Sequence, residues 1–195
     1  MKTIIKYYSK TNYIKQIYQV IESESGVNIK HGEYCSFYPI RFGGKIKKLC
    51  SYKNGKLDGD FIEFYLNEKP SLKCFFKDNE LENEYFEYYP NGDLIYEKNY
   101  KLGKLNGNYI QYLPNNKKYM KTTFKNGEIN GEYILYGNFG EIKDVKLYDN
   151  GVLIDDNKIN TIDSPLATSS LGASSMRLGS ETSFPNRKAK HYVLL

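Results

Sequence analysis

The feature that most limits the fold of this chain is an internal repeat of 24 residues, which occurs four times in succession between Asp58 and Leu153. The four copies read DGDFIEFYLNEKPSLKCFFKDNEL, ENEYFEYYPNGDLIYEKNYKLGKL, NGNYIQYLPNNKKYMKTTFKNGEI and NGEYILYGNFGEIKDVKLYDNGVL. Glycine, aromatic and leucine positions stay in step through all of them. A fixed period of this length indicates a repeat architecture in which each unit covers the apolar residues of its neighbours.

Further copies extend the repeat towards the N-terminus. One begins at His31 and carries three extra residues around Ile40 to Gly44, where a hairpin turn would tolerate insertion. A weaker copy fills the first 30 residues. We therefore expect a repeat domain over residues 1–157, with units near 1–30, 31–57, 58–81, 82–105, 106–129 and 130–153.

Each unit has the pattern of two short strands joined by a turn. In the unit 82–105, an aromatic segment (85–89) precedes Pro-Asn-Gly-Asp, and a second strand is expected over Leu94–Tyr100. Asn-Gly between two strand-like segments is a strong hairpin signal. The composition agrees, because the chain has 20 Tyr and 10 Phe, which favour strands. The sequence predicts an all-β fold: an elongated, single-layer antiparallel sheet of stacked hairpins.

Glycines mark the turns, where a positive φ costs glycine little. Asparagine is the next best residue for that conformation, so Asn79 and Asn83 are reasonable replacements in their units. We assign a structural turn role to Gly55, Gly59, Gly92, Gly107, Gly127, Gly131 and Gly151.

Strand alternation divides the first strands into two faces. One face is apolar or aromatic throughout, as in Ile62/Phe64 and Phe86/Tyr88, and is expected to be a dry core or a dimer contact. The other face is aromatic but interrupted by polar residues. Tyrosine is enriched at protein interfaces, so this face is the candidate interaction surface. The alternative is that its rings only hold neighbouring units together. The candidate binding residues are Tyr34, Phe61, Tyr65, Tyr85, Tyr89, Tyr109 and Tyr133.

The segments 52–61 (YKNGKLDGDF) and 124–133 (FKNGEINGEY) resemble MORN repeats of the variant aromatic-x-Asn-Gly-Lys-Leu-x-Gly-x-Tyr. The resemblance implies a curved sheet of stacked hairpins with roles in protein association and scaffolding, and also membrane-lipid contact. Similar repeats occur in YwqK-type bacterial antitoxins and in proteins of large DNA viruses. The repeats are rich in Lys, Asn, Ile and Tyr and contain one arginine, Arg41. This bias suggests an AT-rich gene, as in the viral group and some bacteria.

The sequence has no pattern of catalytic or metal-binding residues. It contains two His and three Cys, without a Cys-x-x-Cys pair. Cys50 and Cys74 occupy equivalent sites one unit apart, too far for a disulfide. Glu63 and Glu87 recur in the same way and are interpreted as solvated residues of one face. We expect a non-enzyme with no metal and no cofactor, in a reducing intracellular setting.

Charge and hydropathy restrict the partners. Of the formal net charge of +5, the segment from Ser164 onward holds +3, so the repeats carry little net charge and no basic stripe for nucleic acid. The mean hydropathy is −0.63 and no apolar run approaches a bilayer span. Lys6, Ser9 and Lys10 interrupt any signal-peptide core. The expected location is the cytoplasm, or the host cytoplasm or virion if the chain is viral.

The composition changes near Ser164. Residues 164–195 are rich in Ser, Ala and Gly, and a segment of this kind buries too little apolar surface to fold. We expect a low-complexity, disordered tail, which is either native or joined from different DNA.

These observations favour a non-catalytic repeat scaffold that mediates protein–protein interaction or assembly, with a protein partner or a second copy of the chain. Two alternatives remain open at this point. One is an antitoxin or immunity protein that binds a cognate toxin, and the other is a peripheral membrane-binding module.

Overall fold

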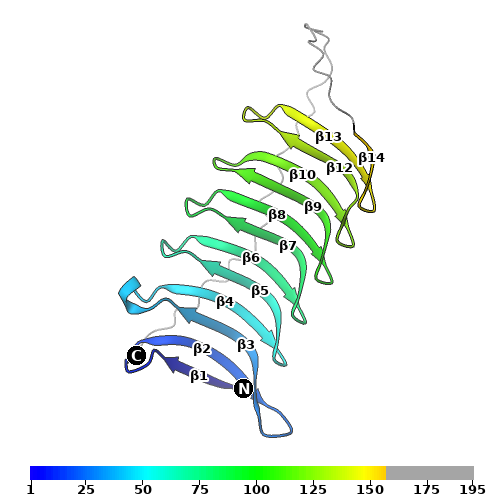
Figure 1. Cartoon of the computed structure of the whole chain (residues 1–195). Helices are drawn as coiled ribbons and strands as arrows, with labels where there is room; N and C mark the ends of the chain where they lie inside the picture. Colours follow the sequence, from blue (N-terminus) through cyan, green and yellow to red (C-terminus); the bar gives the residue numbers. More distant parts are fainter. Residues whose placement is uncertain (157–195) are drawn as a thin grey trace, which may run out of the picture. The chain divides into compact units, whose positions relative to one another are not determined.

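The computed structural model describes residues 1–156, which form one antiparallel sheet of 14 strands in hairpin order (Figure 1). This confirms the predicted all-β, single-layer fold. Apart from one short 3-10 helix, η1 (Ile40–Phe42), the described residues contain no helix. The last residue of the predicted repeat domain, 157, and the predicted tail, 164–195, lie outside the described residues.

The strands follow one another along the sheet in chain order, except that the short β11 pairs only with β10. Their bounds are β1 (Lys2–Tyr7), β2 (Ile14–Glu22), β3 (Asn28–Phe37), β4 (Ile46–Lys53), β5 (Lys56–Phe64), β6 (Pro70–Lys77), β7 (Glu80–Tyr88), β8 (Leu94–Lys101), β9 (Lys104–Leu113), β10 (Lys117–Lys125), β11 (Glu128–Ile129), β12 (Gly131–Tyr136), β13 (Ile142–Asp149) and β14 (Val152–Asp155).

From β4 onward, two-residue turns join each unit to the next along one long edge of the sheet. Both residues of every turn have positive φ, between 45° and 94°. This is the geometry of type I′ turns, whose twist matches that of the flanking strands. The five turns are Asn54-Gly55, Asp78-Asn79, Leu102-Gly103, Asn126-Gly127 and Asn150-Gly151.

A hydrogen bond between successive turns fixes each unit on the one before it. The N–H of the second turn residue donates to the carbonyl of a leucine or isoleucine in the preceding unit. Four such bonds repeat along the edge: Asn79 to Leu57 (2.9 Å), Gly103 to Leu81 (3.0 Å), Gly127 to Leu105 (2.8 Å) and Gly151 to Ile129 (2.8 Å). Since the same atoms are joined in every unit, the turns stack in register.

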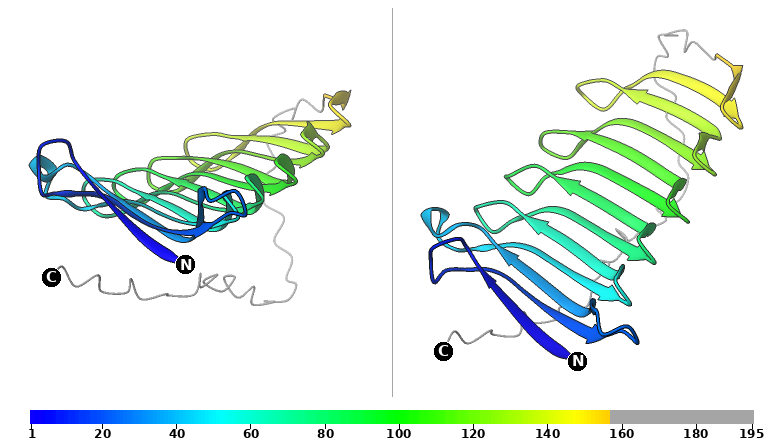
Figure 2. Two further views of the ribbon diagram at one scale, coloured as in Figure 1. Left: turned by 90° about the horizontal axis from the view of Figure 1, so that it is seen from below. Right: turned by 60° about the horizontal axis from the view of Figure 1, so that its bottom comes forward.

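A second set of glycines bends the strands. At Gly107 (φ 110°), a Cβ would lie 3.0 Å from the Asn99 Cβ, so the two strands approach too closely there for a side chain. The pairing register shifts beside the equivalent Gly59, as expected for a β-bulge. Asn83 takes this position in its unit, with φ 62°. Figure 2 shows the resulting curvature of the sheet. All seven predicted turn glycines have positive φ.

The expectation of a dry apolar face is wrong. Pairing places Lys73 between Ile62 and Phe86, and Glu97 beside Phe86 on the other side. Charged side chains of the second strands therefore lie on this face. The prediction of a dry face considered the residues of the first strands alone. Buried residues are few. Besides Val20 of β2, they occur on both faces: Cys35, Ile110 and Tyr112 on this one, and Tyr34, Cys50, Cys74 and Thr122 on the other.

The Leu102-Gly103 turn offers a test of how strongly turn geometry limits stability. Leu102 has φ 50° and a side chain that is 68 % exposed, whereas equivalent turns begin with Asn or Asp. A left-handed conformation is strained for leucine and tolerated by asparagine. We expect Leu102→Asn to raise the free energy of unfolding by about 1 kcal/mol, measured by urea denaturation. The control is Leu66→Asn, an exposed leucine without positive φ; an equal gain in both variants would contradict this reason.

Candidate interaction surface

The predicted binding residues of the first strands lie in one straight row. Cross-strand pairing runs from Tyr34 through Cys50 to Phe61, and from there through Cys74 to Tyr85. It continues in the same register through Lys98 and Tyr109 to Thr122, beside which Tyr133 follows. The row therefore runs along the hydrogen-bonding direction of the sheet. We call this side of the sheet the aromatic face.

A second row of rings accompanies the first on the aromatic face. Each of the five units from residue 31 onward pairs one ring from its first strand with one from its second strand, in edge-to-face or tilted contacts. Centroid distances are 5.9 Å for Tyr34–Tyr52, 5.4 Å for Phe61–Phe76, 5.7 Å for Tyr85–Tyr100, 5.5 Å for Tyr109–Phe124 and 6.4 Å for Tyr133–Tyr148. Sequence reasoning did not name the second row as site residues, although the same 24-residue period carries it.

Lysines lie between the rings. The Lys98 ammonium is 4.8 Å from the ring centroid of Tyr85, 4.1 Å from that of Tyr96 and 5.5 Å from that of Tyr109. Burial among these rings lowers the pKa of Lys98, and the nearby Glu87 carboxylate opposes the shift. Lys48 lies 5.4 Å from the Tyr34 centroid and 5.3 Å from that of Phe61. Such cation–π contacts add to the cohesion of the face.

The hydroxyl groups of the row differ in their partners. The Tyr34 hydroxyl donates to Gln16 Oε1 (2.9 Å) and that of Tyr85 to Glu87 Oε2 (3.3 Å). By contrast, within residues 1–156 no hydrogen bond involves the hydroxyls of Tyr109 and Tyr133. Burial of their rings raises the pKa of both, so both hydroxyls are protonated donors near neutral pH. The second-row hydroxyls of Tyr100 and Tyr148 are also without a hydrogen bond to a described residue.

Tyr65 has a structural role that its sequence pattern did not reveal. Its hydroxyl donates to the carbonyl of Tyr88 in the next unit, at 2.6 Å. The equivalent Tyr38 bonds the Phe64 carbonyl at 2.7 Å. These tyrosines fasten one unit to the next at the hairpin tips. Tyr89, at the same position one unit later, makes no such bond among the described residues.

The pair Tyr65 and Tyr89 makes this fastening testable. Tyr65→Phe leaves the Tyr88 carbonyl without its hydroxyl donor, so we expect a loss of about 1 kcal/mol in the free energy of unfolding. Tyr89→Phe removes a hydroxyl that has no hydrogen bond within residues 1–156 and should change stability little. Both are measured by chemical denaturation. Equal losses in the two variants would show that the hydroxyl of Tyr65 contributes nothing specific.

The three cysteines are free and buried, in agreement with the expected separation of Cys50 and Cys74. Burial raises the thiol pKa from an ordinary 9.0 to about 12 for Cys35, about 11 for Cys50 and about 12 for Cys74. A thiol that stays neutral at neutral pH is a poor nucleophile. These side chains are therefore packing residues.

These shifts predict how thiol reactivity and stability depend on pH. Well below pH 9 the thiols are almost entirely neutral in both states and their stabilising contribution is complete. It is lost as pH rises from 9 towards 11 to 12, because the unfolded thiols ionise first; near pH 8 only the unfolded thiols have a reactive thiolate fraction. We expect no alkylation of the folded protein by iodoacetamide at pH 8 and three alkylated residues after unfolding, by mass spectrometry. Rapid labelling of the folded chain would contradict this burial.

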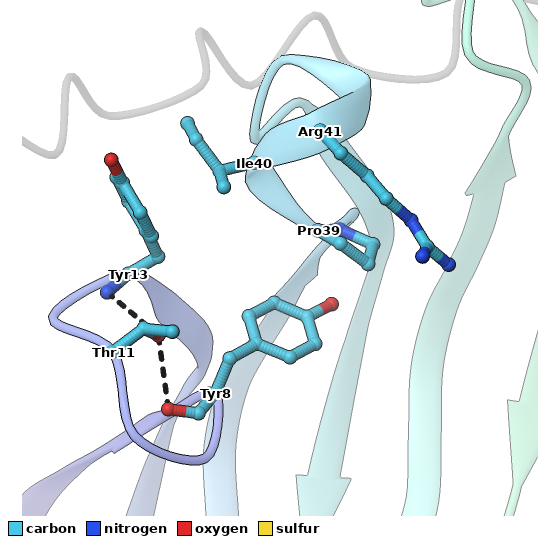
Figure 3. Close-up of a pocket in the computed structure, with 6 residues that line it drawn as sticks. All are labelled: Tyr8, Thr11, Tyr13, Pro39, Ile40 and Arg41. Atoms are coloured by element: carbon cyan, nitrogen blue, oxygen red, sulfur yellow. Dashed lines mark hydrogen bonds between the residues drawn. The ribbon is translucent and has the colours of Figure 1, made fainter.

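Other candidate chemistry is weak. In the part of the chain that the structure describes, no cluster of three His, Cys, Asp or Glu could hold a metal. Glu63 and Glu87 lie on either side of Leu72. His31 Nδ1 is 3.2 Å from Asn54 Oδ1. A shallow depression at the hairpin tips is lined by Tyr8, Thr11, Tyr13, Pro39, Ile40 and Arg41 (Figure 3).

Comparison with known families agrees with this geometry. The family described as MORN repeat variant matches residues 81–102, which span the hairpin of β7 and β8 and the start of the next turn. The chain therefore contains a MORN repeat variant at residues 81–102, which supports the resemblance that its sequence motifs indicated. No curated protein matches the chain. Among the described residues, no helix has the length and apolar character needed to cross a membrane.

Proposed function

We propose that this chain is a non-catalytic scaffold that binds a protein partner through its aromatic face. The observation that carries the proposal is the in-register row of rings in which Tyr109 and Tyr133 keep unbonded hydroxyls among the described residues. Tyrosine combines a large rigid contact area with a polar group, which suits it to protein interfaces.

The identity of the residues argues against a purely structural row. Phe61 and Phe124 show that phenylalanine fits both rows of the aromatic face. A ring that only packs against its neighbours needs no hydroxyl, yet Tyr109 and Tyr133 carry one without a described protein acceptor. Partial burial of these donors is compensated if a bound partner supplies the acceptors.

The non-catalytic part of the proposal rests on the chemistry of the repeats. MORN repeats are generally a non-catalytic repeat module, and the one described histidine, His31, interacts with Asn54. The thiols are buried and their pKa values are raised, which removes them as nucleophiles near neutral pH. Three unpaired cysteines also favour a reducing, intracellular location.

The test replaces tyrosines on the aromatic face and follows partner capture. We expect Tyr85→Lys/Tyr109→Lys/Tyr133→Lys to lose the partners that residues 1–156 capture from an extract of the encoding organism. Tyr13→Lys, at a tip residue that is 50 % exposed, should retain them. Circular dichroism checks that each variant is folded. A photo-cross-linking residue at Tyr133 should label the same partner; capture that survives the triple change, or no cross-link, would place the interface elsewhere.

A further inference from the structure

The distance between successive rings of the aromatic face favours some backbone conformations of a bound partner over others. Each unit adds two strands, and hydrogen-bonded strands lie about 4.8 Å apart, so equivalent rings recur about every 9.6 Å. The pairing from Phe61 through Cys74 to Tyr85 is direct, without a shift, and so is that from Tyr85 through Lys98 to Tyr109. The rings therefore form a regular ladder along the stack.

A polyproline II helix matches this spacing. It has three residues per turn and a rise of about 3.1 Å, so the same side of the helix recurs about every 9.3 Å. The difference of about 0.3 Å per unit stays small over several units. A β-strand presents the same side about every 6.7 Å. An α-helix presents nearly the same side again after seven residues, or about 10.5 Å. Its mismatch with the ring spacing of about 9.6 Å grows to about 2.7 Å over three units.

We propose that the aromatic face binds a proline-rich segment of the partner in the polyproline II conformation, lying along the ladder over β8 to β13. This inference rests on the proposed function and names the class of its partner. Proline rings are apolar and rigid, and they pack well against aromatic side chains. The segment enters already ordered, so little conformational entropy is lost on binding.

Hydrogen bonding is complementary as well. A polyproline II helix has no internal hydrogen bonds, and proline has no N–H, so the segment offers only carbonyl acceptors. The aromatic face offers tyrosine hydroxyl donors along β8 to β13. Within residues 1–156 the hydroxyls of Tyr100, Tyr109, Tyr133 and Tyr148 have no acceptor. The positions between the rings of this row are filled: Lys98 lies over the rings of Tyr85 and Tyr109, and Thr122 is only 1 % exposed. The segment therefore lies on the rings.

The inference is tested with an acetylated and amidated decaproline peptide, titrated into the chain by calorimetry and by NMR of isotopically labelled protein. We expect saturable binding, with shifts confined to the aromatic face, and none with a glycine–serine decamer. The double variant Tyr109→Phe/Tyr133→Phe keeps the rings and removes two donors, so it should weaken binding at least about 5-fold. Tyr13→Phe should leave it unchanged.

Three results would overturn the inference: no saturable binding of decaproline, equal binding of the glycine–serine peptide, or affinity unaffected by the double variant. The cross-link from position 133 separates this inference from the proposed function. If decaproline fails while the native partner still cross-links there, the aromatic face is an interface for another backbone conformation. If both fail, the proposed function fails as well.

Discussion

In-register stacking is the constraint on which the rest of this structure depends. The described sheet is a single layer, so no unit has a core of its own and each buries its residues only against adjacent strands. The hydrogen bond that four of the five turns donate to a leucine or isoleucine of the preceding unit, such as Gly103 to Leu81, sets that register. The rows of rings, the tyrosine fastenings at the tips and the pitch of the aromatic face all follow from it.

Turn chemistry made much of the fold predictable. Asn-Gly and Gly determine local backbone geometry, so the hairpin order and the positive φ of Gly55 or Gly127 could be inferred without knowing any long-range contact. The composition of each face could not be inferred as easily. Bulges near the hairpin tips shift the pairing between Glu63 and Phe64 and between Glu87 and Tyr88, so the alternation of side chains in the first strand does not continue unchanged into the second. Lys73 and Glu97 were for this reason missed as residues that cross the apolar side.

The candidate site shows the same limit at the level of single side chains. Periodicity placed Tyr65 and Tyr109 in one category, because both recur on one side of the first strands. Their hydroxyls separate them: that of Tyr65 bonds the next unit, and that of Tyr109 has no acceptor among the described residues. Repetition in a sequence predicts where a residue lies, but the role of a polar atom depends on which acceptors the neighbouring unit brings within reach.

The 3-10 insertion at Ile40–Phe42 has a consequence for how this protein can change. The extra residues leave the pairing of Tyr34 with Cys50 intact, because they lie at the hairpin tip, opposite the edge where the turns are bonded together. From β4 to β14 the turns of one edge thus keep the same length, whereas the tips of the other edge accept an insertion. Foreign loops grafted at successive tips would be displayed in parallel at a regular spacing, which makes the array a natural framework for building multivalent binding proteins.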